Sequence, residues 1–277
     1  MKLNSAKKTD RYVLKRILTI ALIVYVAVFG LAVLFQRFIM LHPEKLDKDY
    51  AFEFKNAQEF YFATEPKIKL NALMFTTAAN PRKGVVMYLH GNSRNIKAWG
   101  KYAEDFTSRG YDVIMYDYRG FGKSNGRLDE KNLLSDAQTV LKDIQRRYPP
   151  RDIIVYGRSL GTGVATRLAM DNDVKMLILE TPYTSIPAIA WSRLPIYPYS
   201  KVCEFILPAE EWITKVKAPL YLFHGTDDPI IPYSHSLKLA EILKKSPDDI
   251  LTTLPGGRHR GLNKFKEYQT KLDEILK

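Results

Sequence analysis

Two serines have the spacing expected of a hydrolase nucleophile. The pattern G-x-S-x-G occurs as GRSLG at residues 157–161 and as GKSNG at residues 122–126. In this pattern a strained turn from a strand into a helix lifts the serine hydroxyl above a sheet, and small flanking residues leave space for the turn. Such a hydroxyl can attack an acyl carbon and form a covalent acyl intermediate. The pattern alone does not distinguish Ser159 from Ser124.

The surrounding residues favour Ser159. It follows an apolar run of strand length, DIIVYG (152–157), and the small residues of LGTGVATRLAM (160–170) would let a helix pack close to the sheet. Ser124 runs into the polar turn NGRLDEKN and is interpreted as a loop serine. This loop does not match the phosphate-binding pattern G-x-x-x-x-G-K-[ST] either, because its first glycine would fall at Asp117.

The general base can be found among the five histidines by elimination. A serine hydroxyl needs a histidine to take its proton and a carboxylate to hold that histidine. In a fold with this turn, the chain order is serine, carboxylate, histidine, which excludes His42 and His90. His224 and His235 leave no room for a preceding acid on a separate strand end. His259 remains, in the glycine-rich loop PGGRH.

The acid and the oxyanion donors are expected at other strand ends. Asp227 and Asp228 are adjacent in HGTDDP, and because neighbouring side chains point in different directions only one of them can face the histidine. These residues leave the choice open. HGNS (90–93), after an apolar run, fits the loop that supplies one backbone N–H to an oxyanion hole, and Leu160 after the nucleophile supplies the other.

The elements that would position these residues alternate along the chain. Apolar runs of strand length alternate with helical patterns, which is typical of a mostly parallel central sheet with helices on both faces. Two early strands near 52–63 and 67–76 would form an antiparallel edge. Further strands are predicted at 84–90, 112–118, 152–157, 174–180, 218–225 and 248–254, and helices at about 95–108, 131–147, 161–171, 234–245 and 262–276.

One segment does not fit this alternation. Residues 181–217 are rich in proline and aromatic residues and are too long for a plain connection. We predict that they form a lid, because an apolar cover over a site suits an apolar substrate. The alternative is an ordinary structural excursion.

The N-terminal region has the features of a membrane anchor. Residues 17–35 carry no charge and would span about 28 Å as a helix, close to the ~30 Å hydrocarbon core of a bilayer. A cleaved signal peptide is the alternative, although its apolar region is usually shorter. Six Lys/Arg precede the run and three follow within the next 16 residues, so the N-terminus should be cytoplasmic. We predict a basic cytoplasmic tail (1–16), a transmembrane anchor (17–40) and an extracytoplasmic domain (41–277).

Composition narrows the remaining function classes. Cys203 is the single cysteine, so no internal disulfide can form and a cysteine-based zinc site is excluded. The formal net charge is +12, and the first 16 residues contribute much of the excess. Because no Lys/Arg cluster is interleaved with aromatic residues, we expect no nucleic-acid partner. No metal or cofactor is implied.

In order and combination, these motifs resemble the α/β-hydrolase superfamily from about residue 84 to the C-terminus. The chain looks closest to the single-pass, membrane-anchored serine hydrolases of the bud-emergence type. The residues that carry this resemblance are HGNS (90–93), DYRGFGKSNG (117–126), GRSLG (157–161), HGTDDPIIP (224–232) and GGRH (256–259).

The resemblance implies the α/β-hydrolase fold and assigns roles to particular residues. It selects Asp228 as the acid beside Ser159 and His259, and it implies Asn92 and Leu160 as oxyanion donors. Its substrates would be esters or thioesters of acyl or lipid-like groups. Relatives often carry Asn or Asp where this chain has Arg260, so the residue after the histidine departs from the family pattern.

Three functions follow as hypotheses. The first is an esterase-like or lipase-like serine hydrolase acting on lipophilic acyl substrates near a membrane. The second is a serine peptidase, although no propeller or substrate-gating domain is recognisable. The third is a catalytically inactive binding protein on the same fold, against which the complete set of three site residues argues. The sequence predicts neither the natural substrate nor the oligomeric state.

Overall fold

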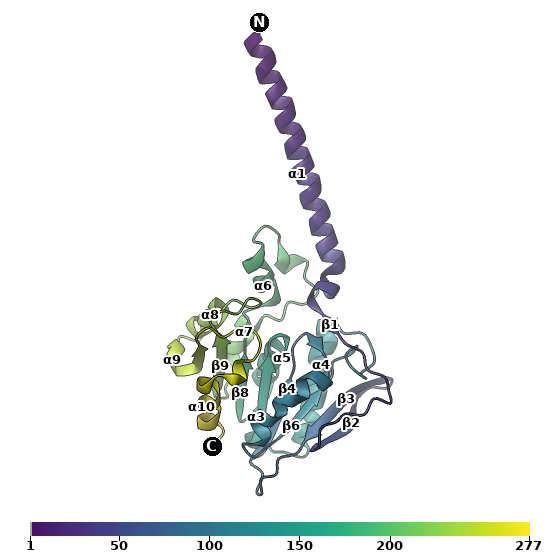
Figure 1. Ribbon diagram of the computed structural model, residues 1–277, viewed down its shortest axis with the longest axis vertical. Helices are drawn as coiled ribbons and strands as arrows, with labels where there is room; N and C mark the ends of the chain where they lie inside the picture. Colours follow the sequence, from purple (N-terminus) through teal and green to yellow (C-terminus); the bar gives the residue numbers. More distant parts are fainter. Residues whose placement is uncertain (1) are drawn as a thin grey trace.

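The computed structural model describes residues 2–277, and the side chains from residue 11 onward. The predicted basic tail (1–16) therefore lies partly outside the described residues. Figure 1 shows one globular α/β domain from which a long N-terminal helix projects. The predicted α/β-hydrolase fold, with its mostly parallel sheet, is confirmed.

The central sheet has eight strands in the order β10-β9-β8-β7-β4-β6-β3-β2. All neighbouring strands are parallel except at the edge, where β2 pairs antiparallel with β3 and β3 pairs antiparallel with β6. This edge is the one predicted from the sequence. The strand bounds are β2 Ala57–Glu65, β3 Ile68–Phe75, β4 Gly84–Leu89, β6 Tyr111–Tyr116, β7 Ile153–Arg158, β8 Met176–Glu180, β9 Leu220–Gly225 and β10 Leu251–Leu254.

Helices cover both faces of the sheet because strand side chains alternate between two cores. In β4, Val85 and Met87 face one core together with α4 (Glu130–Gln145), α5 (Leu160–Asp171) and α8 (Ser234–Ile242). Val86 and Tyr88 face the other core. That face is covered by the short helices α2 (Ile96–Trp99), η1 (Gly100–Ala103) and α3 (Glu104–Thr107), and by η5 (Leu262–Lys264) and α10 (Lys266–Ile275).

Two predicted elements differ from the structure. The single helix expected over 95–108 is divided into α2, η1 and α3, with Gly100 at the first division, where a glycine weakens a continuous helix. The strand expected over 248–254 begins only at Leu251. Pro247 and two following aspartates start the short helix α9 (Pro247–Ile250), because proline and acidic residues both favour a first helical turn.

Residues 181–217, the predicted lid, leave the sheet after β8 and contain four short helices. These are α6 (Ile186–Arg193), η3 (Tyr199–Lys201), α7 (Ala209–Trp212) and η4 (Ile213–Lys215). A short connection then leads to β9. The one remaining short helix, η2 (Pro150–Asp152), precedes β7. In Figure 1, α6 lies at the end of the domain from which the N-terminal helix rises.

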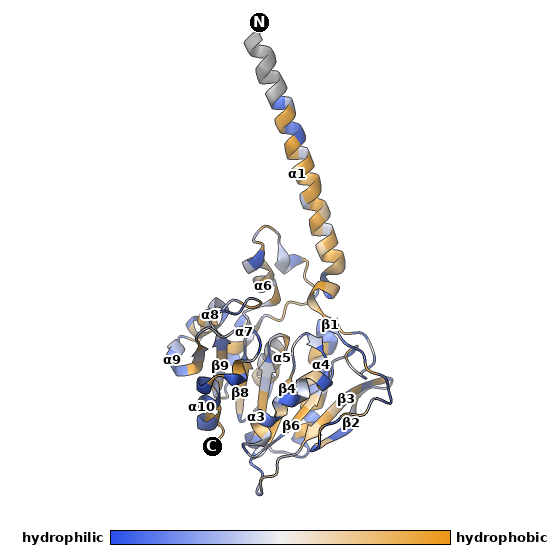
Figure 2. Cartoon of the chain, viewed as in Figure 1, coloured by the Kyte–Doolittle hydropathy of each residue, from blue (hydrophilic) through white to orange (hydrophobic). Residues whose placement is uncertain are grey.

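The N-terminal helix α1 (Lys2–Met40) stands clear of the domain over most of its length and is apolar over most of it (Figure 2). Within the described residues, its segment Arg11–Met40 is the one helix long and apolar enough to cross a membrane. Only Leu41 separates α1 from β1 (His42–Pro43), which pairs in parallel with β5 (Ser93–Arg94). The end of α1 is thereby attached to the loop after β4.

Candidate active site

Ser159 occupies a sharp turn between β7 and α5. Its backbone has φ +52° and ψ −121°, a conformation that a side-chain-bearing residue adopts only where the surrounding structure enforces it. The flanking glycines explain how the chain accommodates this turn. A Cβ on Gly157 would lie 2.5 Å from the Gly161 carbonyl oxygen, and one on Gly161 would lie 2.1 Å from the Leu89 carbonyl oxygen. The predicted strand-turn-helix context of Ser159 is therefore present.

The structure brings Ser159, His259 and Asp228 into one hydrogen-bonded chain. Nε2 of His259 lies 3.0 Å from the Ser159 Oγ, and Nδ1 of the same ring lies 2.7 Å from Oδ2 of Asp228. The histidine arrives on the loop after β10 and the aspartate on the loop after β9. Both distances are within the range required of a nucleophile, its base and the group that orients the base.

The Asp228 carboxylate is held by several donors. Its Oδ1 accepts hydrogen bonds from the backbone N–H groups of Ile230 (2.7 Å) and Ile231 (2.9 Å), and Nε2 of His224 lies 3.4 Å from Oδ2. Burial alone would raise the pKa of Asp228, but hydrogen bonds from His224, His259 and the backbone lower it well below its ordinary value. Asp228 is therefore a carboxylate throughout the physiological range. Asp227 is exposed and accepts a hydrogen bond from the Thr226 hydroxyl.

The predicted oxyanion donors lie at the same cavity as the serine. Asn92, Ser159 and Leu160 all line it. Leu160 is the first residue of α5, so its N–H points out of the helix end, where the helix dipole favours negative charge. Within the described part of the chain, neither the Asn92 N–H nor the Leu160 N–H is paired with a backbone acceptor. The Asn92 side chain is occupied elsewhere, because its amide donates to the Met40 carbonyl.

Arg158 is a further residue of this site that the sequence did not reveal. It occupies the variable position of G-x-S-x-G, yet its side chain is buried and pairs with Glu180 (Nε to Oε1, 2.9 Å). The guanidinium lies over the rings of Tyr102 and Trp99, and Nη2 reaches the His259 carbonyl at 3.5 Å. Arg158 therefore contacts the loop that carries the histidine. A motif that leaves this position open gives no signal for such a role.

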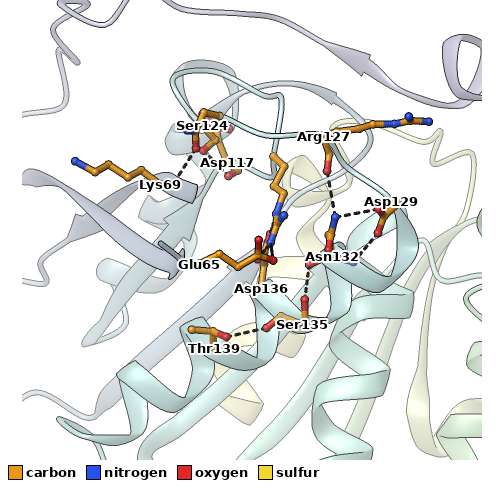
Figure 3. Close-up of polar contacts among 12 residues, drawn as sticks. Glu65, Lys69, Asp117, Ser124, Arg127, Asp129, Asn132, Ser135, Asp136 and Thr139 are labelled. Carbon is orange, nitrogen blue, oxygen red and sulfur yellow. Dashed lines mark hydrogen bonds and ion pairs between the residues drawn. The ribbon is translucent and has the colours of Figure 1, made fainter. Parts of the chain in front are cut away.

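Ser124, the second serine of the pattern, is placed as a structural residue. Its hydroxyl donates to the Asp117 carbonyl at 2.6 Å and accepts from the Asn71 N–H at 2.8 Å. Figure 3 shows Ser124 beside Asp117 and, nearby, Glu65 and Asp136 converging from β2 and α4. These two carboxylates bind the buried guanidinium of Arg119, which fixes the same loop.

The remaining histidines serve the framework around the site. His90 is buried against Tyr118 and lies 3.4 Å from Asp117. Nδ1 of His224 lies 2.6 Å from the Ser236 hydroxyl, so this ring links α8 to the loop of Asp228. The supporting role of His224 was not predicted from the sequence. His42 is exposed in the short strand β1, two residues after the end of α1.

His235 gives a pH-dependent prediction. Burial, with smaller effects of His224 and Arg193, lowers the pKa of His235 from 6.5 to about 4. Between these two pKa values the unfolded chain therefore binds more protons at His235 than the folded chain does. The contribution of neutral, buried His235 to the free energy of unfolding is fully present above about pH 6.5 and is lost as the pH drops toward 4. We expect the thermal midpoint of the detergent-solubilised wild type to drop further between pH 7.5 and pH 5 than that of His235→Asn. Equal drops in the two proteins would contradict this.

An apolar cavity of about 420 Å³ opens above Ser159. Its walls come mainly from residues 181–217, the predicted lid, from α1 and from the loop after Asp228. No described residue that lines it is Asp or Glu, and the single cysteine, Cys203, lies in its wall. The lining residues are Phe29, Ala32, Val33, Gln36, Ile39, Met40, Asn92, Ser159, Leu160, Tyr183, Ile186, Ile189, Ala190, Arg193, Leu194, Tyr199, Val202, Cys203, Phe205, Ile230 and Ile231.

Comparison with known proteins shows which proteins this chain is similar to. The model of a family described as serine aminopeptidase, S33, matches residues 80–208. Human alpha/beta hydrolase domain-containing protein 17B is 28% identical over 245 residues, which cover 87% of this chain and 82% of that protein. The mouse protein 17C is 26% identical and covers 84% of this chain and 72% of its own length.

Solved structures agree on the fold. An esterase of Pyrococcus furiosus superposes with a TM-score of 0.65 at 21% identity, covering 86% of this chain and 97% of that chain. Est1E of Butyrivibrio proteoclasticus, solved with ferulic acid, gives 0.65 at 21% identity, covering 78% and 97%. The finer resemblance to bud-emergence hydrolases stays a prediction. The sheet topology and the solved structures show that the chain has the α/β-hydrolase fold, and its sequence is similar to those of alpha/beta hydrolase domain-containing proteins.

Proposed function

We propose that this chain is a serine hydrolase that cleaves ester or thioester bonds of acyl or lipid-like substrates. The observation that carries the proposal is the continuous chain of contacts from the Ser159 hydroxyl through His259 to Asp228. A serine in a strained turn, a base within reach of it and an ionised carboxylate behind the base are the parts that acyl transfer requires. A binding protein has no physical need for all three together.

The geometry supports a two-step reaction. The Ser159 Oγ attacks the substrate carbonyl carbon while Nε2 of His259 accepts the hydroxyl proton. The Asp228 carboxylate stabilises the resulting imidazolium, and the N–H groups of Asn92 and Leu160 stabilise the oxyanion. The tetrahedral intermediate then releases an alcohol or thiol, which takes the proton from His259. Water, activated by the same histidine, attacks the acyl-serine and releases the carboxylic acid.

The cavity supports an acyl substrate over a peptide. An aminopeptidase has to bind a charged α-amino group, for which a carboxylate is the usual partner. The matched family is described as a serine aminopeptidase, but the described residues lining this cavity include no carboxylate and are mostly aliphatic or aromatic. The Pyrococcus furiosus structure with the same fold carries the name esterase, in line with this preference.

We also propose that α1 anchors the enzyme in a membrane with its N-terminus in the cytoplasm and the domain (41–277) on the other side. The support is the length of the apolar stretch and the excess of Lys/Arg before it. An acyl hydrolase held in this way would act on substrates near the membrane surface.

Covalent labelling of the full-length protein in detergent tests the proposed nucleophile. A fluorophosphonate probe is expected to label the wild type and Ser124→Ala to the same extent and to leave Ser159→Ala unlabelled. Ser124 is the matched control because it has the same sequence pattern in a structural loop. Equal labelling of the wild type and Ser159→Ala would contradict the assignment. Labelling of none of the three proteins would favour the inactive binding protein.

A further inference from the structure

The membrane helix forms part of the cavity above Ser159. Between Phe29 and Met40 it contributes six side chains to the cavity wall, and the opposite wall is the lid. The α1 residues facing the cavity include Phe29, Val33 and Met40, and the lid residues opposite include Ile189 and Tyr199. A helix that served only as a tether would have no reason to line the space that leads to the nucleophile.

Specific contacts hold α1 against the lid. The Tyr25 hydroxyl donates to the Ile196 carbonyl at 2.7 Å, and the ring of Phe29 stacks on that of Tyr197 with centroids 4.8 Å apart. Further down the helix, the Gln36 amide bonds to the lid backbone on both sides, donating to the Val202 carbonyl (3.2 Å) and accepting from the Glu204 N–H (2.7 Å). The lid is thereby fixed along α1 from Tyr25 to Gln36.

The C-terminal end of α1 is also attached to the loop after β4, which carries the proposed oxyanion donor Asn92. The Asn92 side chain donates to the Met40 carbonyl, and the His42 N–H donates to the Asn92 carbonyl at 2.9 Å. The cavity therefore runs without interruption from the apolar flank of α1 to Ser159.

With α1 across a bilayer, the position of these contacts along the helix determines how deep the lid lies in the hydrocarbon core. The stretch from Tyr25 to Gln36 is about 16 Å long at 1.5 Å per residue, roughly half of a ~30 Å hydrocarbon core. The outer side of the lid carries two apolar side chains that are about half exposed in the isolated chain, Trp191 (54%) and Ile196 (50%). The Tyr25 bond also satisfies a lid carbonyl at this depth, as any backbone group placed in lipid requires.

We propose that the acyl chain of a bilayer lipid enters the cavity sideways, between α1 and the lid, and that α1 is one wall of the acyl-binding site. This inference rests on the proposed hydrolase function and adds the route and the substrate source. The lipid keeps its chain in an apolar environment throughout, while its ester bond reaches Ser159 at the membrane surface. A water-soluble short ester can reach the serine without filling the space beside α1.

Two neighbouring residues on α1 allow a matched test in full-length protein reconstituted in phosphatidylcholine vesicles. Val33 faces the cavity, whereas Leu34 is 77% exposed on the outer side of the helix. Val33→Trp should fill the space next to α1 and lower the ratio of p-nitrophenyl palmitate to p-nitrophenyl butyrate turnover at least about ten-fold. Leu34→Trp, with the same ring facing lipid, should keep the wild-type ratio.

The outcomes separate this inference from the proposed function. If the wild type is labelled by fluorophosphonate at Ser159 and hydrolyses both esters, but Val33→Trp keeps the wild-type ratio, then the acyl site on α1 is wrong and the hydrolase remains. If the wild type hydrolyses neither ester and is not labelled, the hydrolase itself is wrong.

Fluorescence tests the entry route. Trp191 lies on the outer side of the lid and is 54% exposed. In vesicles of phosphatidylcholine brominated on its acyl chains, the wild type should be quenched more strongly than Trp191→Phe, because bromine quenches only a ring that it contacts. Equal fractional quenching of the two proteins would show that the lid lies outside the hydrocarbon and would overturn sideways entry.

Discussion

Replacing His259 with alanine is expected to lower ester turnover about a million-fold, as much as replacing Ser159 does. The reason is that Nε2 of His259, 3.0 Å from Oγ, is the acceptor for the hydroxyl proton, and without it the serine remains a neutral alcohol. Because the members of such a chain act as a unit, the double variant Ser159→Ala/His259→Ala should lose no more than either single variant. The measurement is steady-state hydrolysis of p-nitrophenyl butyrate by the full-length protein in detergent.

Arg258→Ala is the control for this prediction. Arg258 is exposed on the same glycine-rich loop, one residue from the base, so its removal disturbs the loop without removing the imidazole. We expect turnover close to that of the wild type. Near-normal turnover in His259→Ala, or a further large loss in the double variant, would rule out His259 as the base.

Replacing Asp228 with asparagine is expected to lower turnover by about four orders of magnitude. An asparagine can still accept from the N–H groups of Ile230 and Ile231 through its oxygen, so the loop should keep its shape. Its amide nitrogen would then face Nδ1 of His259 and favour the tautomer that carries its proton on Nε2. That tautomer cannot accept the proton of Ser159.

Asp227→Asn provides the matched comparison, since the two aspartates are adjacent and the sequence alone left the choice between them open. Asp227 accepts only from the Thr226 side chain among the described residues, at the surface. Its variant should therefore keep nearly full turnover. Thermal unfolding of both variants would show whether the loop is intact. A large loss for Asp227→Asn with little loss for Asp228→Asn would reverse the assignment.

The sequence was sufficient to predict the sheet and to select the candidate residues Ser159, Asp228 and His259, which the structure brings together. Alternating apolar strands and helices predict a parallel sheet, and in such a sheet the ends of β7, β9 and β10 lie along one edge. The fixed chain order of nucleophile, acid and base then left one histidine. These inferences rest on local hydrophobic patterns and on the order of the motifs along the chain, both of which can be read directly from the sequence.

The features that escaped prediction depend on packing between distant segments. Nothing in the sequence indicates that Arg158 is buried and pairs with Glu180 inside the protein. The hydrogen bonds that backbone N–H groups donate to Asp228 could not be predicted, because any residue other than proline supplies the same donor. The contact of α1 with the lid was missed for a similar reason: an apolar run long enough to cross a bilayer does not indicate that one of its faces also packs against protein.

The connection between α1 and the domain is one residue long, Leu41, and it has no room for a flexible stalk. With α1 in a bilayer, the domain could not swing toward targets at different heights, and Ser159 would stay at one fixed level relative to the membrane surface. An anchor of this kind would restrict the proposed hydrolase to bonds at one distance from the membrane, and it would confine the search for substrate to two dimensions.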